Sequence, residues 1–397
     1  MKIRLNRWYV LLGALLAMPC AGAVYTWSLF NNHLMENFGW LQSEVVLAYS
    51  IALFMVAFST MFAGKLQDKF GPRLLAIIGG LLYGSGLMLS STASTLAQLY
   101  IYFGIIAGTG VGFVYICALS TCVKWFPERK GLISGVVLGA FGLGSFIFSP
   151  LVQYLIELAG VSTAFFYLGL VYLTLILTGS MFLVVPEKAA LPAHDTTHKP
   201  ITKTHVDYTT GEMLKTKNFY LIWSIFFLAC TSGHLIISSA ADIGLQLANL
   251  TLTAAAAAVA IISLFNTAGR IVWGAVSDKI GRFRVLSILL VITAVTMILM
   301  SITSLNHITF FVYVGTIAFS FGGFLAIFPS ITGEFYGLKN MGANYGVVFQ
   351  AFGVAALTVP LIVANTETLE STFIVAAILA IIGAVITFFM KDANSVG

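Results

Sequence analysis

Charged residues are scarce in this 397-residue chain: they make up 9% of it, against 59% for hydrophobic residues. Soluble globular domains carry about 25% charged residues, so this composition excludes an ordinary soluble protein. Cysteine is scarce too, and all four lie in apolar stretches without zinc-type spacing or a polar loop for a disulfide. We therefore predict no metal site and interpret Cys20, Cys117, Cys122 and Cys230 as small packing residues.

What the chain does contain is a series of long apolar stretches. Each is close to the ~20 residues that a helix needs to cross a bilayer. They cover residues 8–30, 45–64, 74–91, 97–122, 131–154, 163–185, 218–240, 254–277, 285–304, 307–331, 342–364 and 370–390. The 37 glycines suit close helix packing in lipid. The sequence thus predicts an all-α polytopic membrane protein with twelve transmembrane helices.

Basic residues lie on only one side of these stretches. Nineteen of the 20 Lys and Arg residues precede the first stretch, follow the last, or occupy alternate connections, and the twentieth, Arg270, lies inside the eighth stretch. The opposite connections contain acidic residues but no Lys or Arg. By the positive-inside rule we expect the basic side, with both termini, to be cytoplasmic. The membrane is then the plasma membrane, or the inner membrane of a bacterium, and the net charge of +5 reflects orientation rather than nucleic-acid binding.

One long polar connection, residues 186–217, divides the chain into halves that span residues 1–185 and 218–397. It contains His194, His198 and His205, which could bind a metal, but their irregular spacing and few acidic neighbours favour a solvated cytoplasmic linker. Its last part, Thr209 to Glu212, has the pattern of a capping box, so we predict a short interfacial helix there.

The two halves resemble each other. Residues 64–73 join the second and third stretches, and residues 274–282 join the eighth and ninth, with Gly, Asp, Lys and Gly in register at an offset of 210 (274 minus 64). The same offset relates residues 124–131 to residues 334–339. An offset of six spans preserves topology, so we predict parallel repeats related by an axis along the membrane normal.

The repeated connection predicts a gate. Asp68 and Asp278 lie near helix ends at one membrane face, where they can pair with bases such as Arg73 and Arg282 or cap a neighbouring helix. Pairs that close this face and break when it opens would couple the connections to transport. Alternatively, these segments merely satisfy the positive-inside rule. An acidic residue held in register in both halves favours the gate.

The pattern Gly-x-Leu-x-Asp-x-x-Gly-x-Arg over residues 64–73 resembles the signature of the major facilitator superfamily at every fixed position. Within that superfamily, residues 25–30, 124–131, 266–270 and 344–346 resemble the oxalate/formate antiporter family, and most closely its bacterial pyruvate- and lactate-type carriers. The resemblance implies two six-helix bundles around a central cavity and a secondary transporter of small carboxylates, with no cofactor and no enzymatic activity.

Arg270 is the strongest candidate for the substrate site. It lies about seven residues, or ~10 Å, inside its predicted span, where a charge costs roughly 2.5–3.5 kcal/mol unless it faces protein or water. It could snorkel to the headgroups, but Asn266 lies one turn earlier on the same face. A guanidinium binds a carboxylate through two parallel hydrogen bonds. The resemblance adds that animal monocarboxylate carriers have Asp at the Asn266 position, so here a bound anion would supply the neutralising charge.

The eleventh stretch has no cation, and this absence restricts the substrate. The oxalate exchanger of the family carries a second cation there, whereas residues 342–364 contain no Lys or Arg and have Gln350 and Phe352 at their middle. A second carboxylate would stay unpaired in a low-dielectric site. This favours a monocarboxylate over oxalate.

Five further residues are candidates for the cavity or for coupling. Tyr25, Trp27 and Tyr115 could line the cavity, although packing and interfacial belts are the usual positions of such aromatics. His234 and Asp242 could carry a coupled proton, since histidine titrates near neutral pH. For His234 a hydrogen-bonded place at the outer interface is an equally open alternative.

We therefore expect a monomeric secondary transporter of pyruvate, lactate or formate, coupled to protons or to a counter-anion. An oxalate/formate or other dicarboxylate antiporter, and a non-transporting sensor of small acids, are the alternatives.

Overall fold

The computed structural model describes residues 6–186, 207–366 and 368–390, apart from some side chains within helices α2, α3, α10, α11 and α15. These residues form helices and connections and no strand. The first half contains α1 (Arg7–Gly22), η1 (Ala23–Trp27), α2 (Ser28–Phe38), α3 (Gln42–Phe70), α4 (Pro72–Ser90), α5 (Leu96–Leu99), η2 (Tyr100–Ala107), α6 (Gly108–Trp125), η3 (Pro127–Arg129), α7 (Lys130–Gly142) and α8 (Gly144–Ser180). The second contains α9 (Thr210–Met213), α10 (Lys217–Gln246), α11 (Leu252–Ile280), α12 (Arg282–Ile302), α13 (His307–Tyr336), α14 (Met341–Val348), α15 (Gln350–Ala364) and α16 (Leu369–Phe388).

These helices account for the twelve predicted spans. Nine helical stretches of the described residues are long and apolar enough to cross a membrane. One of them, Pro127–Ser180, is 54 residues long and contains two spans, which meet where the backbone leaves helical geometry at Gly160. Helices α10 and α11 supply the seventh and eighth spans. The predicted all-α fold is confirmed.

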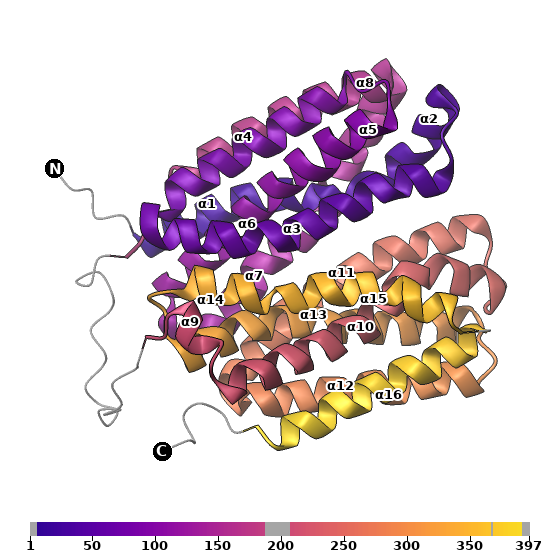
Figure 1. Cartoon of the computed structure of the whole chain (residues 1–397). Helices are drawn as coiled ribbons and strands as arrows, with labels where there is room; N and C mark the ends of the chain where they lie inside the picture. Colours follow the sequence, from indigo (N-terminus) through magenta and orange to yellow (C-terminus); the bar gives the residue numbers. More distant parts are fainter. Residues whose placement is uncertain (1–5, 187–206, 367, 391–397) are drawn as a thin grey trace.

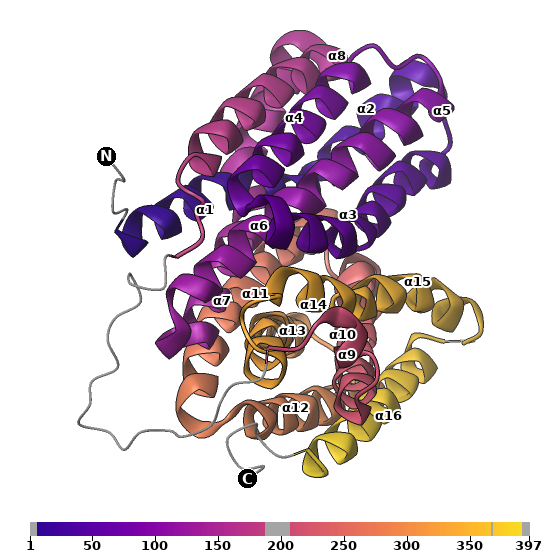
Figure 2. The same ribbon diagram turned by 60° about the vertical axis from the view of Figure 1, so that its left-hand side comes forward.

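The helices form two groups, one from each half of the chain. In Figure 1 most helices of the first half lie above helices α10–α16, and in the turned view of Figure 2 α7 of the first half reaches down beside α11 of the second. Helix α1 begins and α16 ends at the same end of the molecule, beside α9 and α14 (Figure 1). We call this end, where the Lys- and Arg-bearing connections lie, the basic end.

The halves meet through glycines near the basic end. A Cβ added to Gly64 in α3 would overlap the carbonyl oxygen of Gly342, and one added to Gly131 would overlap that of Gly274 in α11. The two crossings are equivalent in the repeat, since Gly64 and Gly274 are 210 residues apart. Only a residue without a side chain allows backbones to approach this closely. The contacts α3 with α14 and α7 with α11 therefore close the basic end.

In both repeated connections a glycine reverses the chain: Gly71 and Gly281 have φ of +90° and +99°, in a region that favours glycine. Other local predictions are confirmed. Thr209 and Glu212 form the predicted capping box at the start of α9. The four cysteines are free and buried. His194, His198 and His205 lie outside the described residues.

Candidate functional site

Arg270 lies inside α11, ten residues or ~15 Å before the helix ends at Ile280. Its side chain is buried, with 4% of the residue exposed. The Nε of Arg270 donates to Oδ1 of Asn266 at 2.9 Å, and Nη1 donates to the carbonyl oxygen of Leu138 in α7. Asn266, one turn earlier on the same face, is thus one partner of Arg270, and a main-chain carbonyl from the other half is another.

A cavity beside Arg270 is lined by aromatic and aliphatic side chains from both halves. Its lining residues are Tyr25, Leu53, Val56, Tyr115, Phe141, Arg270, Leu325, Phe349 and Phe352. Tyr115 stacks on Phe349 with ring centroids 5.0 Å apart, and Phe349 stacks on Phe352 at 4.9 Å. Among these lining residues Arg270 alone carries a charge, so the cavity combines one cation with apolar walls.

The guanidinium has donors to spare. It carries five N–H groups, and its hydrogen bonds to Asn266 and to the Leu138 carbonyl use two of them. The hydroxyl of Tyr25 is a further side-chain partner, and all three of these partners are neutral. A buried cation without a carboxylate partner is unfavourable in a low-dielectric site. The arrangement is therefore suited to accept one small anion.

Of the three predicted aromatic residues, two line this cavity and one lies elsewhere. Tyr25 and Tyr115 line it, and both lie edge-on to Phe141, at 5.5 and 5.4 Å. Trp27 instead stacks on Phe103 at 4.1 Å and lines a separate cavity inside the first half. Residues two apart on a helix point to different faces, so Tyr25 and Trp27 do not share one cavity.

Gln350 has a structural environment in this conformation. Its Nε2 donates to the carbonyl oxygen of Ala57 in α3 at 2.6 Å and to that of Gly346 at 2.9 Å. The side chain thus ties α15 to the first half and is not among the residues that line the cavity.

His234 lies one ring behind the cavity. Its ring is edge-on to Phe321 and Phe352, with centroids 5.1 and 4.6 Å away, and Phe352 lines the cavity. Its Nε2 is buried and has no hydrogen-bond partner in the part of the chain that the structure describes. The side chain of Asp242, the other proton candidate, lies outside the described residues.

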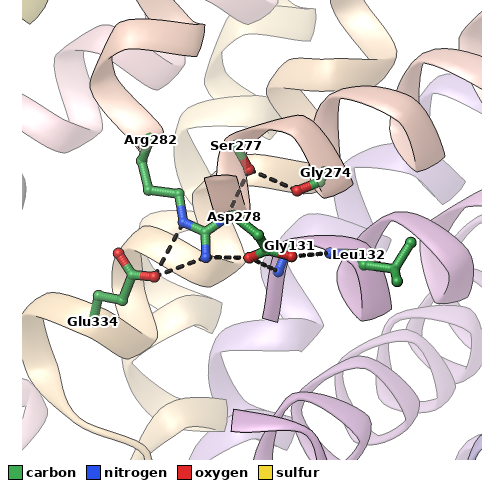
Figure 3. A network of polar contacts seen from close by, with 7 residues as sticks. All are labelled: Gly131, Leu132, Gly274, Ser277, Asp278, Arg282 and Glu334. Carbon is green, nitrogen blue, oxygen red and sulfur yellow. Dashed lines mark hydrogen bonds and ion pairs between the residues drawn. The ribbon is translucent and has the colours of Figure 1, made fainter. Parts of the chain in front are cut away.

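At the basic end Asp278 joins the two halves (Figure 3). Its carboxylate accepts the backbone N–H groups of Gly131 at 3.0 Å and Leu132 at 2.9 Å, at the start of α7 in the first half. Arg282 pairs with Asp278 at 2.6 Å and with Glu334 at 2.8 Å. A carboxylate at a helix N-terminus satisfies free N–H groups and interacts favourably with the helix dipole.

Asp68 makes the equivalent contact in the opposite direction. Its Oδ2 accepts the backbone N–H of Ala343 at 3.0 Å, near the start of α14 in the second half, while Lys124 pairs with Oδ1 at 2.7 Å. Each half therefore caps a helix of the other. Arg73, predicted as a partner, is exposed and belongs to none of the ion pairs among the described residues.

Lys124 and Glu334 are two further members of these ion pairs, and we did not predict them. They occupy equivalent places in the repeat, since 334 minus 124 is again 210. Their charges are opposite, and so are their partners: Lys124 pairs directly with the acidic Asp68, whereas Glu334 pairs with Arg282, which also pairs with Asp278. The register of the repeat was the signal for both.

Comparisons with known proteins agree with this architecture. The sequence profile described as Major Facilitator Superfamily matches residues 10–360. The uncharacterized MFS-type transporter YhjX of Escherichia coli K12 is 37% identical, over 89% of this chain and 86% of its own. The oxalate:formate antiporter of Oxalobacter formigenes is 32% identical, over 89% and 83%. Monocarboxylate transporter 12 of Rattus norvegicus is 23% identical, over 98% and 86%.

Two solved structures share the fold at low sequence identity. The proton:xylose symporter XylE superposes with a TM-score of 0.76 at 14% identity, over 98% of both chains. The transporter FucP, in its outward conformation, gives 0.69 at 15% identity, over 97% of this chain and 98% of its own.

Proposed function

Because the chain belongs to the Major Facilitator Superfamily and is therefore a multi-pass membrane transporter, we propose that it carries a small monocarboxylate across the plasma membrane by alternating access. Pyruvate, lactate and formate are the substrates that fit best. The observation that supports this most is the single cation of the cavity, Arg270, whose partners in the described residues are neutral.

One buried cation is balanced by one carboxylate. The remaining lining residues are tyrosines, phenylalanines and aliphatic residues. A second carboxylate would therefore be desolvated without a counter-charge, which costs several kcal/mol. Tyr25 and Tyr115 add hydroxyl groups that can hydrogen-bond a carboxylate or a neighbouring oxo or hydroxy group.

The gate follows from the reciprocal caps at the basic end. The Asp278 and Asp68 contacts, together with the two glycine crossings, hold the halves against each other in this conformation. Opening the basic end must break both caps, so we assign Asp68, Asp278 and Arg282 to the gate. The positive-inside rule makes this end cytoplasmic, with both termini and the linker, residues 186–217, on that side.

Moving an anion inward against the membrane potential costs about 2.3 kcal/mol per charge for each 100 mV. A coupled proton or a counter-anion removes that cost, and His234, one ring from the cavity, is the candidate proton carrier among the described side chains. We further propose that the two bundles, residues 1–185 and 218–397, work as a monomer.

Oxalate/formate exchange is the second candidate, because one relative at 32% identity is an oxalate:formate antiporter. Counterflow in proteoliposomes distinguishes the two. Proteoliposomes that contain unlabelled lactate or pyruvate take up the labelled compound from outside, and unlabelled pyruvate, lactate, formate or oxalate is added outside as a competitor. We expect each monocarboxylate that is transported to compete better than oxalate. A preference for oxalate over all the monocarboxylates would refute the proposal.

A further inference from the structure

The chain that leads into the second half folds back onto the turn between α13 and α14. We call residues 207–216 the strap. The strap's Tyr208 donates its N–H to the carbonyl oxygen of Tyr336 at 3.0 Å, and Asp207 accepts the N–H of Lys339 at 3.1 Å. Gly337 has φ of +80°, and a Cβ there would overlap the Asp207 carboxylate, so the turn is shaped to admit it.

Asn344 is the main side chain of this contact. It is fully buried, and both the nitrogen and the oxygen of its amide form hydrogen bonds to the strap. Its Nδ2 donates to the carbonyl oxygen of Tyr208 at 3.0 Å, and its Oδ1 accepts the hydroxyl of Thr210 at 3.0 Å. Asn340 donates to the same Tyr208 carbonyl at 2.9 Å. The strap is thus hydrogen-bonded into the second half.

The same turn also contacts the residues that we assign to the gate. The N–H that Asp68 accepts is that of Ala343, the residue directly before Asn344. Lys124, the partner of Asp68, also donates to the carbonyl oxygen of Lys339 at 3.4 Å, and Lys339 in turn donates its N–H to Asp207. The strap and the first half are therefore both hydrogen-bonded to this one turn.

The first half has a weaker counterpart. The start of α1 contacts the connection between α6 and α7, where Arg7 pairs with Glu128 and lies over the ring of Phe126 at 4.9 Å. That ion pair is exposed, with 33% and 41% of the side chains accessible, so it contributes little. The strap, with its buried amide, is the stronger brace.

We propose that Asn344 is a positioning residue for the gate: through it, the strap holds the start of α14 where Asp68 can cap it. The linker between the halves thereby stabilises the closed basic end. The inference rests on the proposed function only through the Asp68 cap and needs no knowledge of the substrate.

The test is a distance measurement across the basic end. Spin labels at Lys69→Cys in α3 and Lys279→Cys in α11, both exposed, report by electron–electron double resonance how far the halves separate there, in the full chain with its four native cysteines replaced. Asn344→Ala and Thr210→Val should each raise the population with a long distance, by about fivefold for each hydrogen bond lost.

Two controls keep the test specific. Thr210→Ser retains the hydroxyl and should restore the wild-type distance distribution. Asn306→Ala removes an amide that caps α13 at the opposite end, where Asn306 accepts two backbone N–H groups, and should leave the basic end unchanged. If Asn344→Ala does not fold, Thr210→Val carries the test alone.

The outcomes separate the inference from the gate itself. If Asp68→Asn opens the basic end while Asn344→Ala and Thr210→Val do not, the strap is only a structural cover and the inference is wrong. If Asp68→Asn also changes nothing, the proposed gate is wrong. Equal opening by Thr210→Val and Thr210→Ser would likewise refute a role for the hydroxyl bond.

Discussion

Replacing Arg270 by lysine separates charge from geometry in the cavity. Arg270→Lys keeps one positive charge but loses the planar pair of donors that matches both oxygens of a carboxylate. A hydrogen bond to a charged group contributes about 1.5–3 kcal/mol. Loss of one of two such bonds should weaken binding about tenfold to a hundredfold, and Arg270→Ala, which loses both, about a hundredfold to ten-thousandfold.

Binding of labelled lactate or pyruvate to purified protein measures this effect, and counterflow gives the corresponding KM. Arg284→Ala is the matched control, because Arg284 is an exposed arginine near the start of α12. Its affinity should stay at the wild-type value. The apparent melting temperature in detergent shows whether each variant is folded, since Asn266 and the Leu138 carbonyl both lose a donor in Arg270→Ala.

The result that refutes the reasoning is specific. If Arg270→Ala is folded and binds or transports a monocarboxylate with an affinity near that of the wild type, the carboxylate is anchored elsewhere. If Arg270→Lys equals the wild type while Arg270→Ala does not, charge alone matters and the planar geometry has no role.

Three further predictions concern the gate, coupling and orientation. Asp278 lies eight residues, about 12 Å along the helix, from Arg270. Asp278→Asn should therefore slow turnover severalfold and change the substrate Kd less than twofold. Loss of substrate binding in a folded variant would place this connection in the substrate site. If His234 carries the coupled proton, His234→Gln should flatten the pH dependence of uptake in proteoliposomes and retain exchange, and an unchanged pH profile would return His234 to a structural role. Cysteines introduced at Ser94 and Thr366 should react with an impermeant thiol reagent added outside intact cells and one at Thr197 should not, whereas the opposite pattern would reverse the orientation.

The sequence by itself determined the properties that depend on position along a helix. Apolar length predicts spans because the bilayer has a fixed thickness. One-sided Lys and Arg predict sidedness, and a lone cation inside a span, Arg270, predicts a polar site because its burial is costly. The offset of 210 predicted two equivalent connections with Asp68 and Asp278. The capping box at Thr209 could also be predicted, because it depends only on side chains and backbone groups a few residues apart.

Only the tertiary structure decided what depends on the rotation of helices and on their neighbours. Tyr25 and Trp27 are two residues apart and point to different faces. Only the packing of the helices shows that Tyr25 lies at the cavity of Arg270 and Trp27 lies inside the first bundle. The partners of Asp68 and Asp278 are backbone N–H groups of the opposite half, which every sequence has and no motif marks. The positions of these N–H groups depend on the glycine crossings, where two helices touch. A glycine in the sequence shows that another backbone can approach closely, but it does not show which helix does so.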